Sequence, residues 1–369
     1  MLEKLDCYIC NRNDFGNGAM VALIVKIGSN TKNIKDRGLS YFVEYMNAEV
    51  MGNPFFKSCS HTGLEETIYL FSTNSENDQF MTQCFNTIGR IMSGDCLYDT
   101  DMEKVRENIS KGFSIADIHK HCAIKRLFGF SAGEIPAGDK LRFEDITRFH
   151  RKWYQAKNAA IIVLCSEKVH KVKQIINNLP PAPLSPSPVI SNEKLFTDVC
   201  NHKTIYFASK ANRRSEPLAE YIKSSLCLHI VIDVIDIIAC NYFGKIGCNV
   251  LHKHNSMEAI TKDWFLIQFH FTLYNEIDNM HVSRFLSELT LSESVFKKAY
   301  QNAETNIIEM SRKKPDIYAI MCEYIQFHLY NEPIMKKEIE LEYLAKSMKE
   351  IDYEMVYGYF EMVKGELVM

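Results

Sequence analysis

The sequence predicts an α+β fold formed by tandem duplication, in which each of two domains has a mixed or antiparallel β-sheet with helices packed on one face. Three observations support this prediction. The chain has 369 residues, more than one ordinary core requires. A proline-rich segment lies near its middle, and strand-like and helix-like runs follow one order on both sides of it. The composition, with 46% hydrophobic and 24% charged residues, is that of a packed globular protein.

The proline-rich segment LPPAPLSPSPVISNE covers 179–193 and holds five of the ten prolines. It has no periodic apolar pattern, which is typical of a stiff, extended linker. We therefore predict an N-terminal domain over 1–178, a linker over 179–195 and a C-terminal domain over 196–369.

The two halves share one order of elements. A run rich in β-branched and aromatic residues is followed by a polar turn and two helical runs, and two further segments come later. Such ordered recurrence with little identity predicts two diverged copies of one unit. Further strand-like runs lie at 21–29, 159–166 and 204–209. The corresponding pairs are 66–72 with 263–274, 79–92 with 280–289, 98–113 with 293–311, 125–136 with 324–335, and 143–154 with 351–362.

Charge and cysteine patterns exclude several classes of protein. The formal net charge is -3 and no long basic block occurs, so we expect no nucleic-acid partner. The twelve cysteines lack the paired spacings of a disulfide framework. The C-x-x-C formed by Cys7 and Cys10 has no second pair to complete a zinc site.

The sequence predicts neither a membrane span nor a cleavable targeting peptide. The longest apolar run, around 227–240, is interrupted by His229, Asp233 and Asp236, so it predicts a buried helix with one polar edge. The N-terminal segment MLEKLDCYIC contains two acidic residues and no arginine, unlike a transit peptide.

One short stretch, RGLSYFVEYMN at 37–47, concentrates the functional information. Tyr41, Glu44 and Tyr45 are spaced i, i+3 and i+4, so a helix would place two phenols and a carboxylate on one face.

This stretch and others resemble motifs of the pitrilysin/insulinase-like H-x-x-E-H inverzincin metallopeptidases. The resemblance is strongest to mitochondrial processing peptidase subunits and the core proteins of the respiratory cytochrome complex. The run at 21–29 ends in Gly-Ser, and 38–46 is similar to the family helix G-x-x-H-F-L-E-H-M, with Tyr41 and Tyr45 in place of the histidines. Residues 59–69 and 154–166 are similar to the N-A-x-T-x-x-x-x-T-x-Y and Y-x-x-x-N elements of the family.

The resemblance implies an inverzincin site that has lost its metal ligands. In active members the two histidines and a later glutamate bind zinc, and the glutamate between the histidines is the general base. Here phenols replace the histidines, and Lys111 or Gly112 falls at the third-ligand position, with Glu103 and Glu107 nearby. We therefore expect no bound zinc or other cofactor and no intrinsic activity. Glu44 survives at the general-base position, and we expect a carboxylate hydrogen-bonded to a backbone group or to Lys111.

The resemblance also suggests roles for neighbouring residues. Tyr41 and Tyr45 are expected to fill the former metal cavity by aromatic packing, with their hydroxyls directed to Glu44 or water. Thr62, Thr67 and Tyr69 of the edge-strand motif are candidate substrate-binding residues.

By this resemblance, the favoured function is that of an inactive subunit that forms a heterodimer with an active family member and helps bind an extended peptide or presequence. One alternative is an active zinc metalloendopeptidase with relocated ligands, drawn from His61, His119, His121 and Cys122 around Glu44. Another is a structural scaffold like the core proteins. The resemblance implies a mitochondrion or a mitochondrion-derived organelle, and the absence of a visible transit peptide leaves the cytoplasm as the alternative.

Overall fold

The chain folds into two compact units, each described by itself below. The first unit comprises Met1–Lys125, Gly129–Glu193 and Pro315–Glu332, and the second comprises Arg126–Phe128, Lys194–Lys314 and Pro333–Met369. The predicted linker at 179–195 lies outside the described residues, so the predicted domain boundaries stay a prediction. The computed structural model describes residues 5–11, 18–31, 33–52, 56–74, 78–112, 115–128, 141–166, 168–177, 201–210, 217–248, 250–261, 264–273, 279–313, 316–365 and 367–368.

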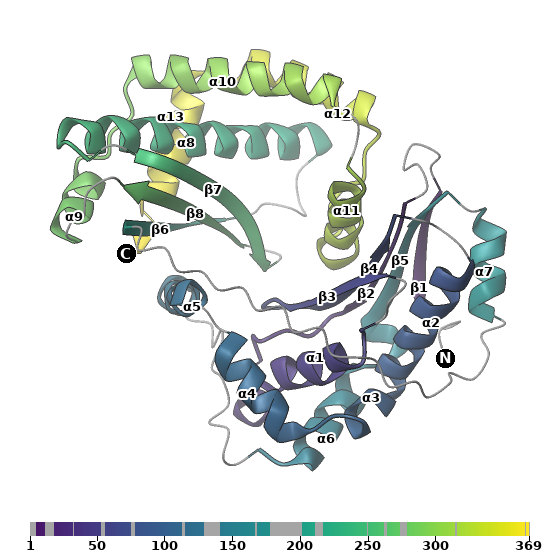
Figure 1. The fold of residues 1–369 in the computed structure, drawn as a ribbon. Helices are drawn as coiled ribbons and strands as arrows, with labels where there is room; N and C mark the ends of the chain where they lie inside the picture. The colour runs from purple at the N-terminus through teal and green to yellow at the C-terminus, as the bar shows by residue number, and fades with distance from the viewer. Residues whose placement is uncertain are drawn as a thin grey trace. The chain divides into compact units, whose positions relative to one another are not determined.

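A mixed sheet of five strands forms the centre of the first unit (Figure 1). Its spatial order is β1-β5-β2-β4-β3, in which β1 pairs parallel with β5 and the other neighbours are antiparallel. β3 therefore lies at one edge. The strands are β1 (Asp6–Asn11), β2 (Ala19–Val25), β3 (Lys57–Thr62), β4 (Thr67–Thr73) and β5 (Ala159–Cys165).

Helices cover one face of this sheet and bury its aromatic side chains, among them Tyr69 and Phe71. Apolar residues from α1, α2, α3, α4, α6 and α7 meet the sheet in one cluster. The helices of this part of the chain are α1 (Leu39–Glu49), α2 (Asp78–Ser93), α3 (Asp95–Tyr98), α4 (Met102–Gly112), α5 (Ile115–Phe128), α6 (Phe143–Trp153) and α7 (Val169–Asn177), with short 3-10 turns at Ile34–Asp36 and Ala156–Asn158.

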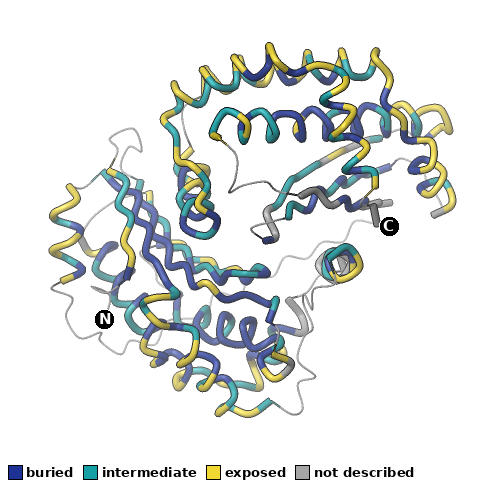
Figure 2. The backbone as a smooth tube through the Cα atoms, turned by 180° about the vertical axis from the view of Figure 1, so that it is seen from behind, coloured by how far each residue is buried: buried dark blue, intermediate teal, exposed yellow. Residues whose placement is uncertain are grey.

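The opposite face of the sheet is covered by α11 (Ile317–Tyr330), which comes from far along the chain. Ile320, Met321 and Ile325 of α11 pack on the outward residues of β2 and β5, such as Ala22 and Ile162. Both strands are buried at every position because both of their faces are covered. Figure 2 shows the inner strands of this sheet in the colour of buried residues.

The second unit is built on an antiparallel sheet of four strands in the order β7-β8-β6-β9. Its strands are β6 (Asn201–Lys210), β7 (Val250–Thr261), β8 (Trp264–Leu273) and β9 (Leu367–Val368). Helices pack on one face, where inward residues such as Phe269 and Phe271 are buried. They are α8 (Leu218–Lys245), α9 (Asn279–Ser287), α10 (Glu293–Arg312), α12 (Lys337–Glu350) and α13 (Tyr353–Gly365).

Helix α8 is the central core helix of the second unit. By length and composition alone it is the one helix in the described ranges that could cross a membrane, yet 67% of its most apolar window is buried inside the protein. It packs against α10, α12 and α13, and this burial accounts for its apolar sequence, as predicted for the run around 227–240.

The two sheets confirm the predicted duplication. The order β5-β2-β4-β3 of the first unit is matched by β9-β6-β8-β7 of the second, and every corresponding pair of neighbours is antiparallel. Strand β1 is an addition to the first sheet, and α12 is an addition to the second unit. The predicted α+β class, with two copies of one sheet-and-helix plan, is therefore confirmed.

Candidate functional site

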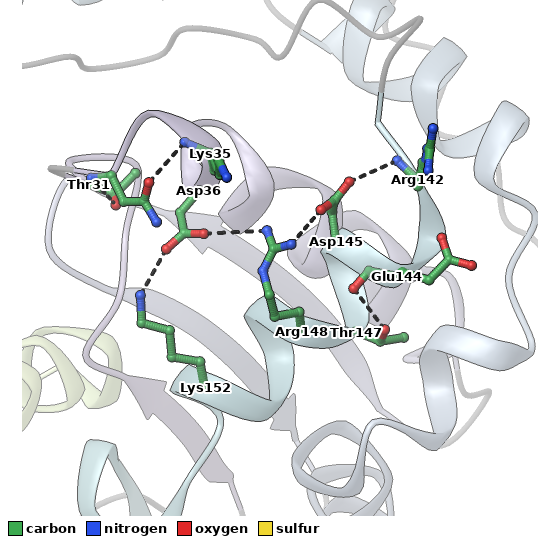
Figure 3. Close-up of polar contacts among 10 residues, drawn as sticks. Thr31, Lys35, Asp36, Arg142, Glu144, Asp145, Thr147, Arg148 and Lys152 are labelled. Carbon is green, nitrogen blue, oxygen red and sulfur yellow. Dashed lines mark hydrogen bonds and ion pairs between the residues drawn. The ribbon is translucent and has the colours of Figure 1, made fainter.

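The helix that carries Tyr41, Glu44 and Tyr45 is α1, and its start is fixed by a buried carboxylate (Figure 3). The Asp36 side chain is 3% exposed and accepts a hydrogen bond from Lys152 Nζ at 2.9 Å, while Arg148 lies 3.7 Å from its other oxygen. Both basic residues belong to α6. Asp36 belongs to the turn before α1, so its ion pairs with these two residues hold that turn against α6.

Two glycines allow the backbone conformations found between β2 and α1. Gly38 precedes α1 with φ 72°, a conformation that favours glycine. A side chain at Gly28 would lie only 2.4 Å from the backbone carbon of Leu64, so the end of β2 can approach the β3–β4 turn closely. Ser29 N and Oγ both donate to Gly63 O, at 2.9 and 3.1 Å. The Gly-Ser motif thus joins β2 to that turn.

Glu44 is buried, and both of its oxygens accept hydrogen bonds from side chains of β3. Ser60 Oγ donates to Oε1 at 2.8 Å, and Thr62 Oγ1 donates to Oε2 at 2.5 Å. Burial raises the pKa of Glu44, and the two hydroxyl donors partly offset this effect. A backbone group or Lys111 is the expected partner of this carboxylate. The donors found are strand hydroxyls 16 and 18 residues away.

Tyr41 and Tyr45 are the residues predicted to replace the two histidines of the family helix. Tyr41 is buried, and its hydroxyl lies 3.5 Å from His121 Nε2. The expected direction of this hydroxyl to Glu44 or water stays a prediction. Tyr45 is partly buried and packs against the core, as expected. In the described ranges no three His, Cys, Asp or Glu side chains come close enough to hold a metal ion. The residues present around Glu44 therefore do not fit zinc.

The residues predicted to fall at the third-ligand position lie on α4. Lys111 and Gly112 end this helix, and the Lys111 side chain lies outside the described residues. Glu103 is exposed and pairs with Arg106 at 3.0 Å, and Glu107 is exposed as well. The substitution of either carboxylate for the lost ligand stays a prediction.

The three candidate substrate-binding residues are buried members of one polar network. Thr67 Oγ1 donates to Ile27 O at 2.8 Å and lies 3.5 Å from Thr62 Oγ1. Tyr69 is fully buried, accepts a hydrogen bond from Asn47 Nδ2 at 2.9 Å, and lies 2.7 Å from the Tyr154 hydroxyl. Their role in substrate binding stays a prediction, and their burial favours support of the strand over direct contact.

Sequence reasoning missed Ser60, Asn47 and Tyr154 as partners in this network. A usable signal existed for each. Ser60 is two residues before Thr62 and so shares its face of β3, and Asn47 is three residues after Glu44 on α1. Tyr154 opens the Y-x-x-x-N element, and its bond to Tyr69 links two of the family-like motifs in space.

The residues proposed as relocated ligands do not gather around Glu44 in the described structure. His61 is exposed and lies between Ser60 and Thr62 on β3, so it points to the opposite face. His121 contacts Tyr41, and Cys122 is exposed. The side chain of His119 lies outside the described residues.

Comparisons with known proteins identify the fold. No protein-family model matches the sequence, and no curated protein matches it significantly. The first half of the periplasmic protease PqqL from Escherichia coli is similar in structure, with 12% identity, a TM-score of 0.71, and coverage of 99% of this chain and 89% of that one. This chain spans only 46% of the full-length PqqL structure.

Shorter proteins are matched over most of their length. The peptidase M16 inactive domain from Pseudomonas fluorescens is 13% identical with a TM-score of 0.62, and 96% of this chain covers 92% of it. A chain of complex III2 from Candida albicans is 14% identical with a TM-score of 0.63, and 96% of this chain covers 89% of it. The protein therefore has an M16 peptidase-like, inverzincin-type fold, which confirms the resemblance inferred from the motifs. More particularly, 99% of the chain matches the fold of the first half of PqqL.

Proposed function

We propose that this chain is a catalytically inactive M16-type subunit that pairs with an active family member and helps bind an extended peptide or presequence. The arrangement of Glu44 carries the proposal. A general base must reach the water that it deprotonates, usually with a metal beside it. Here both carboxylate oxygens are occupied by Ser60 and Thr62, and tyrosines stand at the metal-ligand positions. The similarity to an inactive M16 domain supports the same conclusion.

Peptide binding is proposed at the edge strand β3. In the described part of the chain β3 pairs with β4 on one side, and an extended peptide could add to its other side by main-chain hydrogen bonds. Lys57, Cys59 and His61 alternate as the exposed side chains of β3. The buried Thr62, Thr67 and Tyr69 would then act indirectly, by holding the strand in place.

Binding can be tested with a fluorescein-labelled basic peptide of presequence type and fluorescence anisotropy. We expect the chain to bind this peptide without cleaving it, as judged by mass spectrometry. The same peptide with alternate amides N-methylated is expected to bind at least about tenfold more weakly, because it cannot complete a strand ladder. Equal affinity for both peptides would contradict binding at a strand edge, and cleavage by the purified chain would contradict the inactive assignment.

Pairing with an active subunit can be tested by isolating the tagged chain from its source cells. We propose that the partner carries an intact H-x-x-E-H motif and that the pair cleaves the basic peptide. A mitochondrion or mitochondrion-derived organelle is the proposed compartment, with the cytoplasm as the alternative. A partner without the motif, in a complex without peptidase activity, would contradict this role.

The second candidate function is a structural scaffold that binds other subunits without handling peptides. The similarity to a chain of the Candida albicans complex III2 supports it. The scaffold predicts no binding of the basic peptide, so the anisotropy measurement separates the two candidates. An active metalloendopeptidase with relocated ligands is the remaining alternative, and it requires bound zinc.

A further inference from the structure

The second unit contains a counterpart of Glu44. Since β9-β6-β8-β7 corresponds to β5-β2-β4-β3, and each long helix precedes the edge strand in sequence, α8 corresponds to α1 and β7 to β3. On α8 the buried carboxylate is Asp236, which is 3% exposed. Its Oδ2 accepts hydrogen bonds from two side chains of β7, Lys253 Nζ at 2.6 Å and Asn255 Nδ2 at 3.1 Å.

The two contacts share the spacing of their donors, although Glu44 accepts with both oxygens and Asp236 with Oδ2 alone. In each unit the donors are two residues apart on the edge strand, Ser60 with Thr62 and Lys253 with Asn255. Side chains with this spacing lie on the same face of a strand, which here is the face covered by helices. The register with the neighbouring strand supports this assignment of the face, because Ser60 is paired with the buried Tyr69 and Asn255 with the buried Phe269.

An edge strand has a physical need for such contacts. It gains main-chain hydrogen bonds from one neighbour only, whereas an inner strand gains them from two. A carboxylate is a strong acceptor, and a hydrogen bond to a charged group contributes more to stability than a hydrogen bond between neutral groups. Two donors on the strand and one buried acceptor on the helix therefore fix both the position and the register of the edge.

We infer that Glu44 and Asp236 are positioning residues, each of which fastens the edge strand of its own unit to the long helix that packs on it. We call each set an edge-strand latch: Glu44 with Ser60 and Thr62 in the first unit, and Asp236 with Lys253 and Asn255 in the second. The inference goes beyond the proposed function, since it assigns a role to Glu44 that needs neither metal nor peptide.

The second unit serves as an internal comparison for this role. The residues three before and one after Asp236, which correspond to Tyr41 and Tyr45 around Glu44, are Asp233 and Ile237. Ile237 has no atom that could bind a metal. Asp236 thus makes its contacts to β7 although no pair of possible metal ligands flanks it at these two positions. Glu44 makes the same kind of contacts to β3.

Hydrogen exchange measured by mass spectrometry, without peptide, tests the latches separately. Glu44→Ala is expected to speed exchange in β3 by about ten- to a hundredfold and to leave β7 unchanged, and Asp236→Ala is expected to do the reverse. Glu44→Gln and Asp236→Asn keep one acceptor oxygen and a similar shape but remove the charge, so exchange in the edge strand should rise less than in the alanine variants.

Two carboxylates on the same helices provide matched controls. Glu49 of α1 bonds to Lys104 and Asn108 of α4, and Glu220 of α8 pairs with Lys223, so their alanine variants should not alter β3 or β7. If Glu44→Ala unfolds the unit, the double variant Ser60→Ala/Thr62→Val removes the donors from the strand side instead and should again loosen β3. Unchanged β3 exchange in these variants, or equal changes in β3 and β7, would overturn the inference. Because no peptide is present, this outcome is independent of whether the proposed function holds.

Discussion

Replacing Met321 by aspartate is expected to lower the free energy of unfolding of the first unit by about 3–5 kcal/mol. Met321 is fully buried in the apolar cluster that α11 forms with β2 and β5. The variant would lose this packing and bury a carboxyl group in a cluster made mainly of aliphatic side chains. Since β2 and β5 are covered on this face by α11, loss of the helix would also expose their outward residues to water.

A single tryptophan can report on this unit. The chain has two tryptophans, Trp153 in the first unit and Trp264 in the second, so a Trp264→Phe background leaves Trp153 as the fluorescent probe for urea unfolding. Ala319→Asp is the matched control, because Ala319 is exposed on the same helix. An unfolding midpoint for Met321→Asp equal to that of Ala319→Asp would show that α11 adds little to the stability of the first unit.

Replacing Tyr69 by phenylalanine is expected to cost about 2–4 kcal/mol in the same unfolding experiment. The Tyr69 hydroxyl contacts Asn47 Nδ2 and the Tyr154 hydroxyl, and all three residues are buried, so its removal takes a partner from two buried polar groups. Burial also raises the pKa of Tyr69 far above its ordinary value, so the neutral phenol is the form that makes these bonds.

The exposed Tyr98 provides the comparison for this variant. Its side chain is 64% exposed and contacts Phe143 by its ring, so Tyr98→Phe should change stability by less than about 0.5 kcal/mol. If Tyr69→Phe were equally mild, the network around Glu44 could not be what holds α1, β4 and Tyr154 together.

Much of the fold could be predicted from the order of elements. The strand-like runs at 66–72 and 263–274 became β4 and β8, and the apolar run around 227–240 became the core of α8. These are local patterns, in which the period of apolar residues decides the type of element. The sheet on which α11 packs could not be predicted this way. Its apolar face indicates that the helix packs on another element, but not on which one.

The candidate site, too, could be predicted only where local sequence spacing decides the arrangement. The shared face of Tyr41, Glu44 and Tyr45 follows from helical spacing, and all three lie on α1. The partners of Glu44 depend on how β3 pairs with β4 and how α1 crosses the sheet, which is tertiary information. For the same reason the contact of the Tyr41 hydroxyl with His121, 80 residues away, could not be predicted from the sequence.

Zinc content measured together with peptidase activity tests the central claim most directly, that Glu44 holds a strand and does not act as a base. The purified chain and its Glu44→Gln variant would be analysed for zinc per mole of chain after exposure to zinc and removal of the excess. The account predicts far less than one zinc per chain in both proteins, with no cleavage of the basic peptide by either. One zinc per wild-type chain, with cleavage that disappears in Glu44→Gln, would contradict it and would identify an active metallopeptidase with relocated ligands.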